Sequence, residues 1–554
     1  MRFDAVGARI PGSNQFARHS MARAMDFMKA LRVAPEKIKR GDPRYAFLIR
    51  RDFNKRFTGN PDYVHLVGST EDLVDAVQEA VRSNLRLAVR SGGHCLEGFV
   101  ADPAVRVVID MSLMSGVSYD PEMGAFAVEA GTTLGEVYRR LFLGWGVMIP
   151  AGESPDLGAG GHVLGGAFGF LCRQHGLAAD HLYGVELVVV DQTGTARSVV
   201  ATREPSDPNR ELWWAHTGGG GGNFGVVTRY WFRSPATSGT DPAALLPRAP
   251  DSIHVCRVSW NWDNMNRRDF TRLLRNFGDW CERNSDSDSR YAELCSTLYL
   301  MRRQSGKLEL KALSTAGPDA ERLLDEHLAA VTDGVGAPYT NHVESLSWLA
   351  FALNPFPELF KPVSGGALFK GKDAFLRRRF TDRQMDVAYD YLTRADHDVP
   401  GGMLGLVTYG GRVNSVAPDA TASAQRDSIL ASSYSAGWGD PQDEPRSLAW
   451  VRAFYREMFA DSGGVPAPGE VCDGAMINHP DVDLADPELN TSGIPWHTLY
   501  YKDNYPRLQR IKSHWDPLNV FHHALSVRPL AEAVRLATPT FTPGGASNVR
   551  GRGP

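Results

Sequence analysis

The chain has 554 residues, of which 43% are hydrophobic and 22% charged, with a formal net charge of −4 and a pI near 6.5. This length accommodates two or more domains with sizeable cores. The mildly acidic balance argues against nucleic acid or an anionic membrane as partner, because both select for a basic surface. We therefore expect a globular protein that acts on a small molecule.

Neither the cysteines nor the apolar residues suggest a metal centre, a signal peptide or a membrane span. The six cysteines show no C-x-x-C pair and no metal-ligand spacing, so free thiols and no metal are expected. The stretch from Met1 to about Met28 lacks a continuous apolar core, and no run reaches the ~20 apolar residues that span a bilayer. We expect a cytoplasmic protein, and the oligomeric state stays open.

Residues 1–40 are polar and are predicted to form a partly helical extension. The first regular elements follow it. Ser69-x-x-Asp72 is typical of a helix start, and apolar residues from Leu73 to Val81 recur at helical spacing. Leu85, Leu87 and Val89 then alternate with other residues, which predicts a half-buried strand.

The predicted strand ends in Arg90-Ser91-Gly92-Gly93-His94. Two glycines let successive N–H groups face one anion, so this turn can hold a phosphate. In a Rossmann site the glycine loop opens a helix, but here the next element is another predicted strand, Val105–Asp110. Loop backbone alone would then hold the phosphate. Taken by itself, the pentapeptide is equally compatible with a surface turn.

A second glycine-rich stretch follows a helix predicted to start at Thr133. It runs from Gly152-Glu153-Ser154 through Gly160-Gly161-His162 to Gly176. Such glycine density allows the backbone to approach a flat ligand closely. A flexible linker is the alternative, but apolar residues such as Val163 and Phe168 are threaded through the stretch, and linkers lack them.

The third glycine run, Gly218 to Gly222, lies between a predicted hairpin and a predicted strand. Val185, Leu187 and Val189 alternate into a turn and a return strand, and the apolar strand Val226 to Phe232 follows the glycines. As a bare motif, five glycines are weak evidence.

The composition changes near Ser234, where Pro, Gly and Ala residues suggest a linker. Residues 250–475 mix predicted strands with amphipathic helices, which indicates an α+β domain with an antiparallel sheet and helices on one face. A final segment, from Trp496 to Phe521, is rich in aromatic residues, and the Pro/Gly-rich tail 537–554 is expected to be disordered.

The three glycine stretches, in this order, resemble the FAD loops of the berberine-bridge-enzyme-like oxidases, within the vanillyl-alcohol-oxidase (PCMH) type of flavoprotein. The resemblance implies an FAD-binding domain of two α+β subdomains over 41–235, a substrate domain over 250–475 and a C-terminal segment over 476–536 that returns to the FAD domain. It also implies that FAD is bound by Arg90, Ser91, Gly92, Gly93, His94, Cys95, Ser154, Leu157, Gly158, Gly160, Gly161, His162, Gly165, Asn223, Gly225, Val226, Val227, Tyr501 and Asn504.

In that family the histidine matching His94 is bonded covalently to the 8α-methyl group of FAD. Many members carry a second bond, from a cysteine to the flavin C6, where this chain has Ser154. A serine hydroxyl is far less acidic than a thiol, so one covalent link, at His94, is expected. Leu157 matches a position where leucine goes with poor reaction with oxygen, so either O2 or another electron acceptor is compatible with the sequence.

The family's usual chemistry removes a proton from a substrate O–H while hydride leaves for flavin N5. Tyr500 matches the tyrosine of the family's tail motif and is the candidate base. The alternative is that Tyr500 is a packed aromatic residue whose hydroxyl is already hydrogen-bonded within the protein. Its usual carboxylate or amide helper corresponds to Ser433 here, so the acid–base machinery looks incomplete. His497, Tyr434 or Tyr409 are the candidates to compensate.

These observations predict an FAD-dependent oxidoreductase acting on an alcohol or hydroxylated ring of a specialised metabolite. A flavin-dependent oxygenase or oxidative cyclase on the same scaffold is one alternative. A flavoprotein that binds its ligand without turnover is another.

Overall fold

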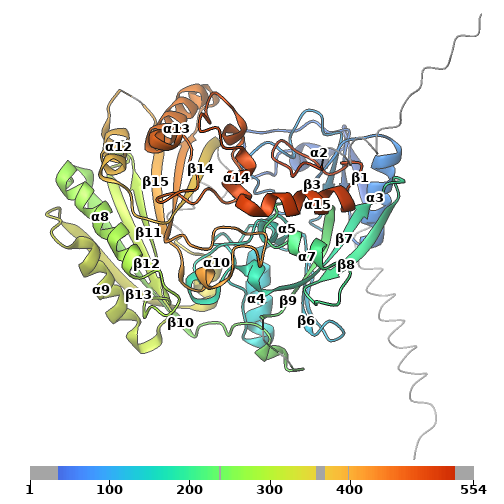
Figure 1. Cartoon of the computed structure of the whole chain (residues 1–554), viewed down its shortest axis with the longest axis horizontal. Helices are drawn as coiled ribbons and strands as arrows, with labels where there is room; N and C mark the ends of the chain where they lie inside the picture. The colour runs from blue at the N-terminus through green and yellow to red at the C-terminus, as the bar shows by residue number, and fades with distance from the viewer. Residues whose placement is uncertain (1–34, 236, 238, 357–367, 397, 531–554) are drawn as a thin grey trace, which may run out of the picture.

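The computed structural model describes residues 35–235, 237, 239–356, 368–396 and 398–530. Two α+β parts lie side by side, and the C-terminal helices cross back from one to the other (Figure 1). The predicted architecture, two α+β subdomains joined to an α+β domain built on an antiparallel sheet, is confirmed.

The first sheet carries the loop that begins at Arg90. Its strand order is β1-β2-β4-β3, with β2 and β3 parallel to β4 and β1 antiparallel to β2. Ser69 caps the predicted helix by accepting a hydrogen bond from the Asp72 N–H at 3.1 Å. The elements are β1 (Glu36–Lys39), α2 (Pro43–Leu48), β2 (Tyr63–Leu66), α3 (Thr70–Arg82), β3 (Leu87–Arg90) and β4 (Val107–Asp110).

The second sheet is antiparallel, in the order β5-β6-β9-β7-β8, and contains the predicted hairpin as β7 and β8. A short helix over residues 159–164 carries part of the second glycine stretch, and the third glycine run lies in the loop before the strand Val226–Phe232. The elements are β5 (Val117–Asp120), β6 (Ala125–Glu129), α4 (Leu134–Trp145), α5 (Ala159–Leu164), α6 (Cys172–His175), β7 (Leu182–Val190), β8 (Ala196–Thr202), α7 (Arg210–Ala215) and β9 (Val226–Phe232).

The third sheet has seven strands in the order β13-β10-β12-β11-β15-β16-β14, every neighbouring pair antiparallel. Helices α8, α9, α12 and α13 cover its outer face (Figure 1). The elements are β10 (Ser252–Asn261), α8 (Arg267–Arg283), β11 (Leu294–Met301), β12 (Lys307–Ser314), α9 (Ala320–Thr332), β13 (Tyr339–Ser347), α10 (Trp348–Leu353), β14 (Leu368–Leu376), α12 (Asp382–Thr393), β15 (Gly401–Thr408), β16 (Leu430–Trp438) and α13 (Glu444–Met458).

Strand register decides which side chains face away from these helices. Asp373 pairs with Ser433, Ser433 with Gly405 and Gly405 with Tyr299, so the four residues form one row across β14, β16, β15 and β11. Because side chains alternate along a strand, Tyr434 lies on the opposite face from this row. Its ring packs against Phe454 of α13, with ring centroids 5.3 Å apart.

The C-terminal segment returns to the first part through α14 (Trp496–Tyr501) and α15 (Tyr505–Trp515), and α15 contacts α7. Lys512 on α15 is fully buried. Its ammonium group donates to the carbonyl oxygens of Asn223 and Phe521, both at 2.6 Å, and to the Asp516 carboxylate at 2.5 Å. This one cation therefore fastens the C-terminal segment to the end of the third glycine run.

The two ends of the chain differ from the predicted organisation or lie outside the described residues. The last residues of the predicted 1–40 extension, Glu36–Lys39, form strand β1 and pair with β2, so the first sheet begins inside the predicted extension. Residues 1–34 and the tail predicted to be disordered lie outside the described residues. Within the described part of the chain, no helix combines the length and apolar character needed to cross a membrane.

Replacing Lys512 with methionine should strongly destabilise the fold. The variant leaves the fully buried Asp516 carboxylate without its cation, and breaking a buried ion pair costs about 3–5 kcal/mol. Chemical denaturation should show a decrease of this size in the free energy of unfolding. The double variant Lys512→Met/Asp516→Asn should recover part of the loss. A decrease below about 1 kcal/mol, the value of a surface pair, would contradict the assignment.

Candidate active site

The loop after β3 is held by its own first residues. The Arg90 guanidinium donates twice to Asp110 Oδ2, at 3.0 and 2.9 Å, and both side chains are buried. The Ser91 hydroxyl donates to the Ala130 carbonyl at 2.6 Å. Both residues were predicted to bind FAD, and the structure shows their side chains bonded to protein groups that fix the loop.

The middle of this loop fits an anionic cofactor. Gly93 has φ +78°, which a residue with a side chain adopts only with strain. Among the hydrogen bonds of the described residues, none is donated by the backbone N–H of Gly92, Gly93 or His94. Backbone donors without protein partners at a glycine turn are what a phosphate-binding nest provides.

The first and second glycine stretches touch through their backbones. A Cβ on Gly92 would lie 2.2 Å from the Gly158 nitrogen, and one on Gly160 would lie 2.7 Å from the Ala130 carbonyl oxygen. Only glycine permits such approach. At Gly161, by contrast, a Cβ would meet nothing within 4 Å, so this residue borders open space between the loops.

The third glycine run is ordered by residues that the sequence assigned to FAD binding. The Asn223 amide donates to the Gly219 and Gly220 carbonyls at 3.0 and 3.1 Å and accepts from the Val527 N–H at 2.8 Å. The Tyr501 hydroxyl also donates to Gly219, at 3.0 Å. The remaining members of this group are anchored in the same region: Asn504 donates to Pro418 and Thr421, Gly225 packs on Val188, and Val226 and Val227 are buried in β9.

His94 lies in the loop with its ring stacked on Phe53, with centroids 4.7 Å apart and planes at 14°. Burial lowers the pKa of His94 to about 4, against the opposing charge of Asp156. The imidazole is therefore neutral at pH 7, which is the form that has a nucleophilic nitrogen. Burial raises the pKa of the neighbouring Cys95 thiol to about 12, so this thiol stays protonated.

A histidine and a carboxylate that sequence reasoning missed meet near this loop. His479 Nδ1 lies 3.5 Å from Asp373 Oδ2, and the side chain of His479 is 50% exposed whereas that of Asp373 is 5% exposed. Asp373 Oδ2 also accepts the Met476 N–H at 3.2 Å. Asp373 Oδ1 is buried without a hydrogen-bond partner among the described residues. The pair thus presents an accessible imidazole backed by a buried carboxylate.

The titratable groups around His479 shift one another's pKa values. Burial alone would lower its pKa, but the hydrogen bond to Asp373 and the charges of Asp373 and Glu153 raise it above the ordinary 6.5. Burial raises the pKa of Glu153 to about 7, with His479 opposing. Burial, then the charges of His479 and His94, lower the pKa of His162 to about 3, and its Nε2 accepts the Gly152 N–H at 2.9 Å. His94, the pair Glu153 and His162, and His479 come from three separate segments and lie close enough to influence one another's charge.

The loop of His479 is bonded directly to the second glycine stretch. Asn478 donates to the His162 carbonyl at 3.0 Å and accepts from the Ala167 N–H at 3.2 Å. A Cβ on Gly165 would lie 2.3 Å from the Asn478 amide, so Gly165 is needed for this contact.

The residues predicted to be catalytic have their polar groups or rings engaged by other parts of the protein. Burial and the charges of Asp481 and Asp373 raise the pKa of Tyr500 well above its ordinary value, and its hydroxyl already accepts the Asp481 N–H at 2.9 Å. This geometry favours the packed-aromatic alternative for Tyr500. Tyr434 faces α13, on the wrong side of the sheet.

The other two compensating candidates are also occupied. The His497 ring stacks on Tyr505, with centroids 3.7 Å apart, and burial lowers its pKa. Tyr409 is buried and its hydroxyl donates to the Gln425 carbonyl at 3.1 Å. His479 replaces all of these residues as the candidate base.

The carboxylate expected at Ser433 is found across the strand pair. Asp373 of β14 pairs with Ser433 of β16, so a carboxylate one strand away occupies the same row. The available sequence signal for His479 was a histidine among polar residues, Asn478 to Asp483, in a segment without apolar periodicity.

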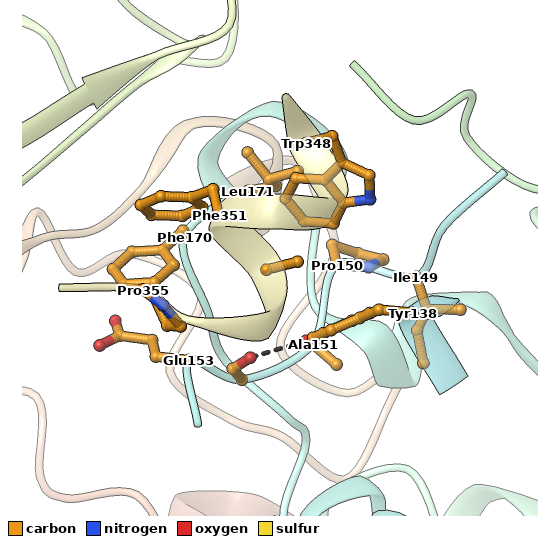
Figure 2. Close-up of a pocket in the computed structure, with 12 residues that line it drawn as sticks. Tyr138, Ile149, Pro150, Ala151, Glu153, Phe170, Leu171, Trp348, Phe351 and Pro355 are labelled. Atoms are coloured by element: carbon orange, nitrogen blue, oxygen red, sulfur yellow. Dashed lines mark hydrogen bonds between the residues drawn. The ribbon is translucent and has the colours of Figure 1, made fainter. Parts of the chain in front are cut away.

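A small hollow borders the second glycine stretch (Figure 2). Its walls come from Tyr138 of α4, the segment Ile149–Glu153, and Trp348 and Phe351 of α10. The Tyr138 hydroxyl donates to the Gly152 carbonyl at 2.6 Å, the bond drawn dashed in Figure 2. The lining is largely apolar, and Glu153 lies at its edge, so one residue borders both the hollow and the titratable groups.

Comparisons with known proteins agree with this arrangement. Residues 61–199 match the FAD binding domain family, and residues 475–528 match the berberine and berberine-like family. The aclacinomycin-N/aclacinomycin-A oxidase of Streptomyces galilaeus is 53% identical over 500 residues, 90% of each chain. The crystal structure of aclacinomycin oxidoreductase matches with TM-score 0.86 and 51% identity, over 90% of this chain and 100% of that one. A glycopeptide hexose oxidase complexed with teicoplanin matches with TM-score 0.86 and 50% identity, over 90% and 99%.

Substituting Gly92 with alanine should remove most of the bound flavin. The added methyl carbon would lie 2.2 Å from the Gly158 nitrogen, so the two loops must separate. The flavin-to-protein ratio of the purified variant, from its visible absorbance, measures the loss. Gly144→Ala is the control, because a Cβ there meets nothing within 4 Å and the residue is in helix α4. Equal flavin content in the two variants would refute the predicted role of the backbone contact.

Proposed function

Because the chain belongs to the berberine-bridge-enzyme-like family of FAD-linked oxidoreductases and is an FAD-linked oxidase of specialised metabolites, we propose that it oxidises a carbinol of a sugar ring, with His479 as the proton acceptor and one covalent flavin link at His94. The observation that carries the proposal is the pairing of the accessible His479 ring with the buried Asp373 carboxylate at 3.5 Å.

The His479–Asp373 pair meets the requirements for removing a hydroxyl proton. Asp373 holds Nδ1, which leaves Nε2 for a substrate O–H within hydrogen-bond reach. Transfer of the proton would make an imidazolium, which the charges of Asp373 and Glu153, the same charges that raise the pKa of His479, would stabilise. The arrangement has the logic of a base oriented by a buried carboxylate.

The cofactor would be held by the glycine loops. The backbone N–H groups of Gly92, Gly93 and His94, which donate no hydrogen bond within the described part of the chain, suit its phosphates, and the neutral His94 ring suits the covalent link. When bound, FAD supplies the acceptor for the hydride. Ser154 stands where a thiol would be needed for a second link, so we infer a single tether.

The row of residues above His479 suits a polyhydroxylated ring. Ser433 and Tyr299 are hydroxyl side chains on the same face as Asp373, and Gly405 lies between them in the row. A Cβ at Gly405 would approach Ser433 Oγ to 2.6 Å, so a larger residue there would displace the Ser433 hydroxyl. The relative described as a glycopeptide hexose oxidase supports a sugar as substrate, and the relatives named oxidases support O2 as electron acceptor, against the expectation from Leu157.

Replacing Asp373 with asparagine should slow the reaction and shift its pH dependence to lower pH. The base must be neutral to accept a proton, so the rate of flavin reduction in wild type rises with pH through a pKa above 6.5. Removing the negative charge destabilises the imidazolium and lowers that pKa. Anaerobic stopped-flow bleaching with a hexose-bearing substrate, measured across pH, tests both effects.

Two further variants delimit this prediction. His479→Ala should lose about 10²- to 10⁴-fold in rate, which is the usual contribution of a general base. Tyr434→Phe, on the opposite face of the sheet, should keep the wild-type pH profile. A shifted profile for Tyr434→Phe with an unchanged one for Asp373→Asn would reverse the assignment.

Acid precipitation should leave the flavin on the protein. After proteolysis, peptide mass mapping should find it on the peptide that contains His94 and none on the peptide that contains Ser154. His94→Ala should release the flavin into the supernatant, and Ser154→Cys should acquire a second link because a thiolate is accessible near neutral pH. Release of all flavin from wild type would exclude the covalent tether.

A further inference from the structure

Six charged residues form a cluster at the edge strand β14, on the face opposite Asp373. We call it the ion cluster: the cations of Lys370, Lys372 and Arg452 and the carboxylates of Glu97, Asp481 and Asp483. Apart from Arg452, every side chain is at most 4% exposed, and cations and carboxylates balance. Buried charges are tolerated only when paired, so the geometry of this cluster is tightly determined.

Lys370 joins two loops that both border the candidate active site. Its ammonium group contacts Glu97 Oε1 and lies 2.7 Å from Asp481 Oδ1. Glu97 is three residues after His94, and Asp481 is two residues after His479. One buried cation therefore binds the loop of the predicted flavin tether and the loop of the candidate base.

The same strand also carries the carboxylate behind the base. Asp373 follows Lys370 by three residues on β14 and faces the opposite side of the sheet. The Asp481 N–H donates to the Tyr500 hydroxyl at 2.9 Å, which further limits movement of the loop. Displacing Lys370 would therefore change the position of His479 relative to His94, while Asp373 stays in the sheet.

Lys372 offers a natural comparison two residues along the strand. It lies 2.5 Å from Asp481 Oδ2 and 2.9 Å from Asp483 Oδ2, and the Asp483 carboxylate is also bonded by Arg452. Within the described part of the chain, Lys372 forms no ion pair with Glu97. Lys372 thus fastens the His479 loop to the sheet without joining it to the His94 loop.

We propose that Lys370 is a positioning residue that sets the spacing between the flavin-bearing loop and His479. Its kinetic consequence rests on the proposed function, because His479 must lie within reach of a hydroxyl on a substrate held against the flavin. Misplacing a reacting group by about 1 Å can cost 10²-fold in rate.

The test compares Lys370→Met with Lys372→Met, each loaded with FAD. Lys370→Met should lower the rate of flavin reduction by about 10- to 100-fold with little change in KM, and should move the pH at which the rate is half-maximal. Lys372→Met should change the rate several-fold less. Lys370→Arg, which can still pair with both carboxylates, should recover most of the rate.

Two readouts do not depend on turnover. Visible-region circular dichroism of the bound flavin reports the His94 loop, and the rate at which diethylpyrocarbonate modifies His479, followed by peptide mass, reports its exposure. Lys370→Met should change both, and Lys372→Met only the second. If no sugar substrate reduces the flavin of the wild-type enzyme, the proposed function fails. The dichroism and the diethylpyrocarbonate rate would still decide the role of Lys370.

A charge-balanced variant tests the proposal even if Lys370→Met fails to fold. Glu97→Gln/Lys370→Met removes one charge of each sign, so the remaining ion cluster stays neutral and the protein should fold. It lacks the link between the loops and should keep the defects of Lys370→Met in rate, pH profile and dichroism. Wild-type behaviour of this double variant, or equal defects in Lys370→Met and Lys372→Met, would overturn the proposal.

Discussion

Buried cations hold together the segments from which the site is built. Lys370 pairs with a carboxylate 273 residues away in the chain, and Lys512 donates to a carbonyl 289 residues away. Both ammonium groups are enclosed by oxygen atoms, and a charge without partners in such a place would cost several kcal/mol. The glycine loops and the loop of His479 therefore have little freedom to move apart, although none of them belongs to a long helix or strand.

This rigidity matters because the proposed chemistry depends on groups from different loops. His94 follows strand β3, Glu153 and His162 lie in the second glycine stretch, and His479 lies in a loop at the start of the C-terminal segment. Backbone contact between Gly92 and Gly158 joins the first two loops, and Asn478 joins the second to the third. The low pKa values of His94 and His162 and the raised pKa of His479 are consequences of that assembly.

The pairing of His479 with Asp373 also shows how a sheet can preserve a site while its residues change. A carboxylate expected on β16 at Ser433 is present on β14, at the position paired with Ser433. Cross-strand neighbours lie about 5 Å apart, so either strand can place a carboxylate behind a base at this point of the row. Ser154, in turn, leaves His94 as the side chain suited to bind the flavin covalently.

The sequence by itself determined the fold family, the glycine loops and the candidate tether, because these depend on local backbone requirements. A turn that brings Gly92 against other backbone needs glycine whatever surrounds it, and His94 follows within the same loop. The face of a side chain and its hydrogen-bond partner depend instead on register and on distant segments. Tyr434 lies against α13, the Tyr500 hydroxyl is bonded by Asp481, and His479 meets Asp373. Only the tertiary structure decided these, because ion pairs and strand pairs join residues far apart in the chain and leave no periodic pattern in the sequence.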